Sequence, residues 1–140
     1  MSQENVEVVR QAFETWERGD LEGHLRFVHE DIVCQRMAPL IDSKVYRGVE
    51  GYLQWAGDWL RPYEDFRFHP SEYIDAGDRV LVEVPQEGRL AGSDQVMTGV
   101  FWFLFTLRDR KVTRFEIYGE RDQAREAAGL APRDADTGAT

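Results

Sequence analysis

The side chains that could do chemistry are few, and two of them lie two residues apart. Cys34 and Arg36 belong to a predicted strand at residues 31–37 and therefore share one of its faces. If Arg36 points inward, its guanidinium needs an internal carboxylate or an anionic ligand, and it could stabilise negative charge on a bound carboxylate or enolate. The alternative is that Arg36 reaches solvent at the end of the strand, as most arginines do.

Cys34 is the only cysteine in the sequence. A neighbouring cation would lower the pKa of its thiol and favour the thiolate, whereas a lone cysteine among apolar residues is usually an inert small hydrophobe. An internal disulfide is excluded, and the sequence contains no Cys/His spacing typical of a metal site. We therefore expect no metal and no other cofactor.

Three further residues could move protons. His69 and Tyr73 lie in a predicted strand at residues 66–74, where alternation places them on one face and Glu72 on the other. The pair could transfer protons at the mouth of a cavity, although polar pairing across strands at the surface explains it equally well. His24 lies near the apolar stripe of a predicted short helix at residues 21–28, either as a general acid or base or as a hydrogen-bonded packing residue.

The elements that must position these groups follow from hydrophobic spacing. Apolar residues three and four apart predict a first helix that ends at Gly19, and a third helix at residues 49–60 that points Trp55 and Trp59 into the domain. Further elements are strands at 31–37, 66–74 and 79–90, a hairpin of 96–107 with 111–118, and a brief helix at 121–128. Three helices before long antiparallel strands predict an α+β fold, in which a strongly curved, mostly antiparallel sheet wraps the helices around a cone-shaped cavity.

The acidic composition excludes several classes of partner. With a net charge of −9 and a pI near 4.8, the chain lacks the clustered Lys and Arg that nucleic acids and anionic membranes require. The length predicts one domain at residues 1–130, and the small polar residues of 131–140 predict a disordered tail. Because no leader or membrane-spanning run is apparent, we expect a cytoplasmic protein.

Five short segments, taken in order, carry a family resemblance. They are residues 17–21 (ERGDL), 28–33 (VHEDIV), 45–51 (VYRGVEG), 106–109 (TLRD) and 111–116 (KVTRFE). Their order and spacing resemble the SnoaL-like branch of the nuclear transport factor 2-like superfamily, which has the cone-shaped α+β fold. The resemblance implies a small hydrophobic ligand and a homodimer that pairs through the outer face of the sheet, with Trp102, Leu104 and Tyr118 in the interface.

The resemblance also implies which side chains face the cavity. They are Trp55, Trp59, Val80, Val82, Val84, Phe101, Phe103, Phe105, Phe115, Ile117 and Cys34, although ordinary core packing is the alternative for such a set. An ungapped comparison puts the three catalytic positions of the ketosteroid isomerases of this superfamily at Ala12, Arg36 and near Phe103. None of these is a Tyr or an Asp, and an arginine stays protonated and cannot be a general base. We therefore do not expect a ketosteroid isomerase.

Two functions remain open from the sequence. The first is an isomerase, cyclase or dehydratase acting on a small hydrophobic carbonyl or polyketide-like compound, with Arg36 stabilising the anion and His69, Tyr73 or His24 carrying the proton. The second is a non-catalytic small-ligand-binding or dimeric accessory domain, which requires only the apolar cavity and the paired outer faces. A cavity with no titratable group other than Arg36 would favour the second, whereas His69 or an acid within hydrogen-bond reach of a ligand would favour the first.

Overall fold

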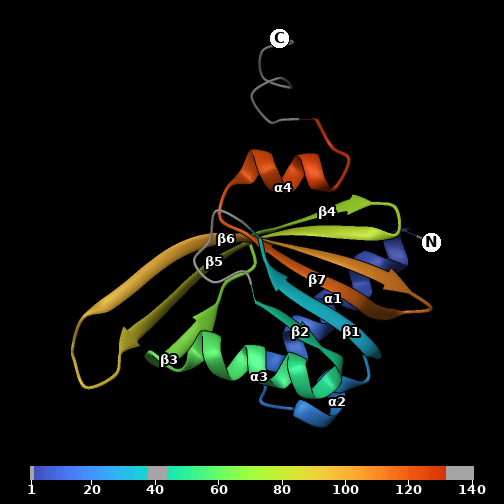
Figure 1. Ribbon diagram of the computed structural model, residues 1–140. Helices are drawn as coiled ribbons and strands as arrows, with labels where there is room; N and C mark the ends of the chain where they lie inside the picture. Colours follow the sequence, from blue (N-terminus) through green and yellow to red (C-terminus); the bar gives the residue numbers. More distant parts are fainter. Residues whose placement is uncertain (1, 38–43, 132–140) are drawn as a thin grey trace.

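The computed structural model of the protein describes residues 2–37 and 44–131 (Figure 1). The helices are α1 (Ser2–Glu17), α2 (Leu21–Leu25), α3 (Gly48–Leu60) and α4 (Arg121–Ala127). The strands are β1 (Val28–Arg36), β2 (Val45–Arg47), β3 (Tyr63–Phe68), β4 (Glu72–Ala76), β5 (Arg79–Leu90), β6 (Val96–Arg108) and β7 (Lys111–Tyr118). The predicted disordered tail, residues 131–140, lies outside the described residues from position 132 onward.

The strands form one mixed sheet in the order β2-β1-β7-β6-β5-β3, with β4 also paired to β5. β1 runs parallel to β7, and the other pairs among the described strands are antiparallel. Helices α1, α2 and α3 lie on one side of the sheet and α4 lies on the other (Figure 1). The predicted α+β fold, with helices packed in a mostly antiparallel sheet, is confirmed.

β6 is buried on both faces along its second half, as its uninterrupted apolar run predicts. Phe103 and Phe105 belong to an inner cluster with Trp55 of α3 and Phe115 of β7, whereas Leu104 belongs to an outer cluster. The predicted orientation of the odd-numbered phenylalanines toward the helices is therefore confirmed. The inner cluster is the larger of the two, and it surrounds the site described below.

The outer face of the sheet is covered by α4 of the same chain. Leu104 and Tyr118 are buried against this helix, and Arg79 Nη1 donates a hydrogen bond of 2.6 Å to the carbonyl of Ala127 at its end. The family resemblance places Leu104 and Tyr118 in a dimer interface, and the structure shows that α4 already covers both side chains within one chain. Trp102 is half-buried beside them.

The second helix is shorter than predicted and the first strand is longer. α2 ends at Leu25 and β1 begins at Val28, whereas the apolar spacing predicts a helix through residue 28. Gly23 weakens the helix from within, and Val28 is buried in the sheet, where a β-branched residue packs well. Val28, which helical spacing alone assigns to the second helix, therefore belongs to β1.

Pro70 divides the predicted strand 66–74 into β3 and β4. A proline has no N–H to donate to a ladder, and here the neighbouring amides of His69 and Ser71 donate instead to the carbonyls of Pro85 and Glu83, at 2.7 and 2.9 Å. Pro85 predicts an edge or a bend, yet β5 is a central strand. It is tolerated there because the N–H that it lacks would point to the break between β3 and β4.

Gly88 of β5 lies where two aromatic residues of β3 approach its backbone. A Cβ at this position would lie 3.0 Å from Phe66 Cδ2 and 3.0 Å from Tyr63 Cβ, so Gly88→Ala is expected to lower the free energy of unfolding by about 1–3 kcal/mol. Gly57 provides the control, because it is exposed in α3 and has nothing within 4 Å of such a Cβ. Gly57→Ala is expected to raise stability by about 0.5–1 kcal/mol. Urea unfolding measures the free energy of unfolding of both variants. Equal changes in this free energy would contradict the close approach at Gly88.

Candidate functional site

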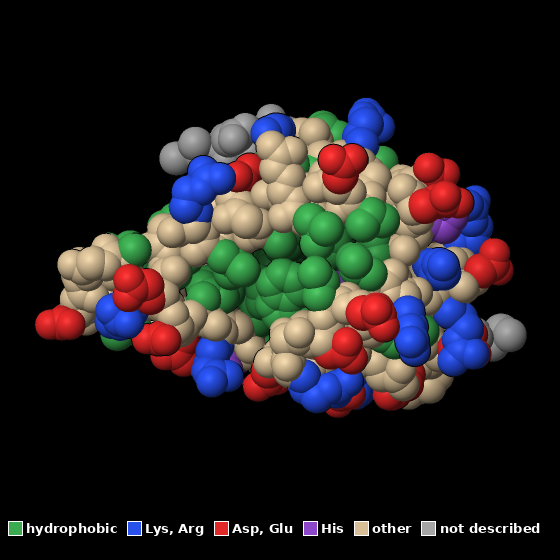
Figure 2. Space-filling view, turned by 90° about the horizontal axis from the view of Figure 1, so that it is seen from below, with side chains coloured by type: hydrophobic (Ala, Val, Ile, Leu, Met, Phe, Trp, Pro, Cys, Tyr) green, Lys and Arg blue, Asp and Glu red, His purple; other side chains and the backbone are tan. Residues whose placement is uncertain are grey.

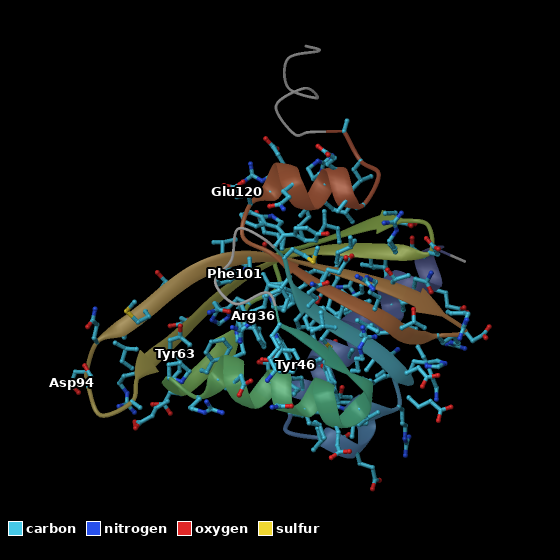
Figure 3. The ribbon with its side chains drawn as sticks, in the orientation of Figure 1. Arg36, Tyr46, Tyr63, Asp94, Phe101 and Glu120 are labelled. Carbon is cyan, nitrogen blue, oxygen red and sulfur yellow. The ribbon has the colours of Figure 1, made fainter. Side chains whose placement is uncertain are left out.

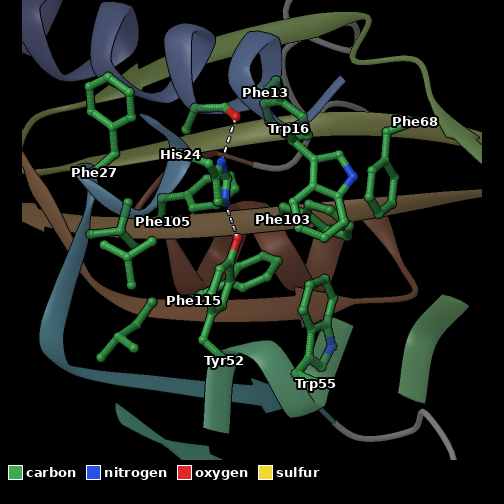
Figure 4. A pocket seen from close by; sticks show the side chains of 14 residues that line it. Phe13, Trp16, His24, Phe27, Tyr52, Trp55, Phe68, Phe103, Phe105 and Phe115 are labelled. Atoms are coloured by element: carbon green, nitrogen blue, oxygen red, sulfur yellow. Dashed lines mark hydrogen bonds between the residues drawn. The ribbon is translucent and has the colours of Figure 1, made fainter. Parts of the chain in front are cut away.

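A cavity of about 40 Å³ lies between the inner face of the sheet and helices α1, α2 and α3 (Figure 4). Its walls are aromatic and aliphatic, and their titratable members are His24 and Tyr52. The lining residues are Ala12, Phe13, Trp16, His24, Phe27, Val28, Ile32, Tyr52, Trp55, Phe68, Phe103, Phe105, Val112 and Phe115. Figure 2 shows apolar side chains gathered around a hollow on the face seen from below.

Three helices bring the polar pair of the cavity together. His24 lies in α2, whose start is capped by the side chain of Asp20, which accepts a hydrogen bond of 2.9 Å from the amide of Gly23. Tyr52 lies on the inner face of α3, and α1 contributes the carbonyl of Ala12. The pair thus depends on the packing of α1, α2 and α3 around one point.

The hydrogen bonds of His24 define its tautomer. Nδ1 lies 2.8 Å from the carbonyl oxygen of Ala12, which can only accept, so Nδ1 carries the proton. Nε2 is then an acceptor, and the hydroxyl of Tyr52 donates to it over 2.6 Å. The result is a chain of donation that runs from Tyr52 through His24 to the main chain of α1 (Figure 4).

Burial keeps both members of this pair uncharged. Loss of solvent lowers the pKa of His24, and the hydrogen bond to Ala12 opposes this only in part. Burial also raises the pKa of Tyr52, with a smaller contribution from Cys34. At neutral pH the cavity therefore presents a neutral imidazole and a protonated phenol. The Tyr52 oxygen, whose own proton is committed to His24, remains able to accept a hydrogen bond from a ligand.

The predicted cavity residues divide into two groups. His24, Trp55, Phe103, Phe105 and Phe115 line the cavity. The others pack in the same inner cluster without lining it: Cys34, Trp59, Val80, Val82, Val84, Phe101 and Ile117. The sequence interpretation missed the wall that the helices supply, above all Tyr52, Phe13 and Trp16, although helical spacing already placed all three on inward faces.

Arg36 turns inward at the end of β1. Its guanidinium lies 5.1 Å from the ring centre of Trp59, and its Nε is buried without a hydrogen-bond partner in the part of the chain that the structure describes. Trp59 in turn contacts Phe101 edge-on, with ring centres 5.0 Å apart, and Figure 3 shows Arg36 between the sheet and α3. Arg36 is not among the residues that line the cavity.

Cys34 is fully buried, and burial raises the pKa of its thiol to about 12. Of the two alternatives for Cys34, the inert small hydrophobe is therefore the one that fits, because the loss of solvent keeps the thiol protonated at neutral pH. A protonated, buried thiol is a poor nucleophile, so Cys34 acts here as a small apolar side chain.

His69 and Tyr73 do not form a pair. The break at Pro70 changes the alternation between them, and the prediction that they share a face is wrong. His69 is exposed, with Nε2 2.7 Å from Oε1 of Glu87. Tyr73 packs edge-on against Phe13, with ring centres 6.2 Å apart. Neither residue lines the cavity.

The matches to known proteins agree with this architecture. The model of the SnoaL-like domain matches residues 9–115. The chain belongs to the SnoaL-like family. The matched segment contains every lining residue of the cavity, from Ala12 to Phe115. No curated protein matches this SnoaL-like chain in sequence.

Solved structures place the SnoaL-like chain among the NTF2-like folds. An NTF2-like protein from Burkholderia xenovorans is 27% identical, with a TM-score of 0.70 over 91% of this chain and 97% of that one. TerC, co-crystallised with polyporic acid, is 24% identical, with a TM-score of 0.71 over 90% and 98%. An NTF2-like protein of unknown function from Burkholderia pseudomallei is 19% identical, with a TM-score of 0.72 over 91% and 96%. The predicted superfamily is confirmed.

Two classes of feature are missing from residues 2–37 and 44–131 of this SnoaL-like protein. None of the helices there is both long and apolar enough to cross a membrane. No group of three or more His, Cys, Asp or Glu side chains in the same residues could hold a metal ion.

Proposed function

We propose that the protein binds a small apolar molecule that carries a hydroxyl or enol group, in the cavity between the sheet and helices α1, α2 and α3. The observation that carries this proposal is the direction of the hydrogen bonds at Tyr52. Its proton goes to His24 Nε2, which leaves the lone pairs of its oxygen as an acceptor, and Tyr52 lines the cavity. A ligand O–H would extend the chain of donation, whereas a carbonyl would have to compete with His24 for the same proton.

The aromatic walls and the family support a small-molecule ligand. Ten of the lining side chains that Figure 4 labels are aromatic or imidazole rings, which give a planar apolar body a large contact area. TerC, which shares the fold, was co-crystallised with polyporic acid. The free volume of about 40 Å³ is small, so a ring enters only if half-buried wall residues such as Phe13, Trp16 and Phe68 move aside.

A second candidate function is catalysis by proton transfer, such as isomerisation of an enol. The ligand proton would pass to Tyr52 Oη while the proton of Tyr52 passes to His24 Nε2, and the short contact of 2.6 Å favours such a relay. Against it, the described lining contains no carboxylate, and a histidine with a lowered pKa is a weak base. Binding is therefore the function supported best, with cyclase, isomerase or dehydratase chemistry as the alternative.

Three small ring compounds, of which phenol and toluene have the same number of heavy atoms, test the role of Tyr52. We expect phenol to bind about two- to tenfold more tightly than toluene or benzaldehyde, because phenol alone can donate to Tyr52 Oη. Tyr52→Phe removes the acceptor and should abolish this preference while leaving the affinity for toluene nearly unchanged. Isothermal titration calorimetry measures all three affinities.

Tyr118→Phe is the matched control for this experiment, because Tyr118 is buried on the outer face of the sheet, away from the cavity. It should keep the preference for phenol. Equal affinities for phenol and toluene in the wild-type protein would contradict the proposal, and so would a preference for phenol that survives Tyr52→Phe.

Arg36 and the outer face of the sheet extend this proposal. Arg36 could bind the anionic end of a ligand, since the guanidinium rests on Trp59 and its Nε has no acceptor among the described residues. A homodimer through the outer sheet face would use Trp102, which is half-buried, and would not reach Leu104 or Tyr118 without displacing α4.

A further inference from the structure

A second cavity lies directly beside the first. It measures about 100 Å³ and is lined by Phe13, Trp16, Glu17, Phe66, Arg67, Phe68 and Pro70. Phe13, Trp16 and Phe68 line both cavities, and we refer to these three side chains as the partition. The inner cavity, with Tyr52 and His24, and the outer cavity, with its charged rim, thus share this layer of rings as a common wall.

Packing between rings, and no strong polar contact among the described residues, holds the partition in place: Phe13 and Phe68 both contact Phe103, with ring centres 6.3 and 5.6 Å apart. All three of its side chains are half-buried, and Trp16 is the second-last residue of α1. At the outer rim, Arg67 Nη1 lies 3.8 Å from Glu17 Oε1, and both side chains are largely exposed. Such an ion pair contributes little to stability. The partition can therefore rearrange without breaking a buried hydrogen bond or a strong ion pair.

The volume of the inner cavity indicates that a bound ligand would move the partition. An apolar cavity that binds benzene measures about 150 Å³, whereas the inner cavity measures about 40 Å³. A ring that reaches Tyr52 must therefore displace part of the partition, and the space behind the partition is the outer cavity. Entry of one ring opens a path that a second ring can occupy.

We propose that the two cavities form one site for an elongated molecule of at least two aromatic rings, with a polar group at its outer end. This inference rests on the proposed function, because it takes the inner end of the ligand to be the hydroxyl that donates to Tyr52. The second ring lies in the outer cavity beside Phe66 and Pro70, and its polar group meets Arg67 and Glu17 at the rim. The site thus selects ligands by length as well as by the hydroxyl group.

A series of phenols tests the length of the site. We expect the wild-type protein to bind 4-phenylphenol at least about tenfold more tightly than phenol, because the second ring is removed from water in the outer cavity. Trp16→Ala should tighten the binding of both phenols, since neither then has to displace the indole, and Phe68→Leu is a second variant with the same expected direction. Calorimetry measures the affinities, and a crystal structure with 4-phenylphenol should show the outer ring beside Phe66.

The controls separate this inference from the proposed function. Trp102→Ala removes a half-buried indole from the other face of the sheet and should leave both affinities unchanged. Arg67→Gln should weaken 4,4′-biphenol, which has a second hydroxyl, more than 4-phenylphenol. If phenol binds but the second ring adds nothing in the wild-type and Trp16→Ala proteins, the two-cavity site is wrong and the proposed function stands. If phenol itself fails to bind, the proposed function falls with it.

Discussion

Phe103→Ala is expected to lower the free energy of unfolding by about 3–5 kcal/mol. Phe103 is 2% exposed and its ring contacts those of Phe13, Trp55, Phe68 and Phe115, with centres between 5.0 and 6.4 Å apart. Truncation removes the ring that joins the sheet to α1, α3 and β3, and the surrounding rings can only partly fill the space. Urea or guanidinium unfolding measures the loss.

Phe101→Ala is the control for this prediction, because Phe101 lies two residues away on the same face but is only half-buried. We expect Phe101→Ala to lower the free energy of unfolding clearly less than Phe103→Ala does. Benzene should restore part of the stability of Phe103→Ala by filling the enlarged cavity. A loss below about 1 kcal/mol for Phe103→Ala would mean that the inner cluster does not depend on this ring.

The stability of the protein is expected to fall as the pH falls below about 6.5, and His24 is the reason. Burial lowers the pKa of His24 in the folded protein from its ordinary value of 6.5. Between the folded and the ordinary value the unfolded chain binds more protons than the folded one, so protonation favours unfolding. The expected slope approaches about 1.4 kcal/mol per pH unit until the folded pKa is reached. Denaturant unfolding from about pH 7 to about pH 5 measures it.

His24→Gln should be less stable than the wild type at neutral pH, because the glutamine cannot reproduce both hydrogen bonds of the imidazole, but its stability should change less with pH in this range. His69→Gln serves as the control, since His69 is exposed and pairs with Glu87 outside the cavity. If the free energy of unfolding of His24→Gln changes with pH as steeply as that of the wild type, other groups cause the pH dependence. This result would contradict the neutral buried imidazole.

The long strands were predictable because their β-branched and aromatic residues favour a strand over a helix. β5, β6 and β7 begin where the sequence predicts and end within one residue of it, since β-branched and aromatic residues alternate or run without interruption between clear turns. The break at Pro70 and the role of α4 were not predictable in this way. The break at Pro70 depends on which carbonyls of β5 need an N–H donor from the neighbouring strand. The position of α4 depends on which apolar face of the sheet is still uncovered once the strands have paired.

The candidate site was predictable in part. The sheet wall of the cavity follows from strand alternation, so Phe103, Phe105 and Phe115 could be identified from the sequence. The polar pair could not, because Tyr52 and His24 are 28 residues apart and meet only when α2 and α3 pack on α1. A tyrosine within an aromatic helical stripe is most often core, and nothing in its spacing indicates a hydrogen bond to an imidazole.

The pairing of β1 with β7 joins two strands that are far apart in the chain. During synthesis β1 leaves the ribosome before α3 and strands β2 to β6, and its parallel neighbour follows only after all of them. Until then the aromatic residues between them have no completed sheet to pack against, and contacts of such long sequence separation form slowly. The nascent chain is therefore expected to expose apolar surface from the synthesis of β1 until β7 docks, and to depend on chaperones during that interval.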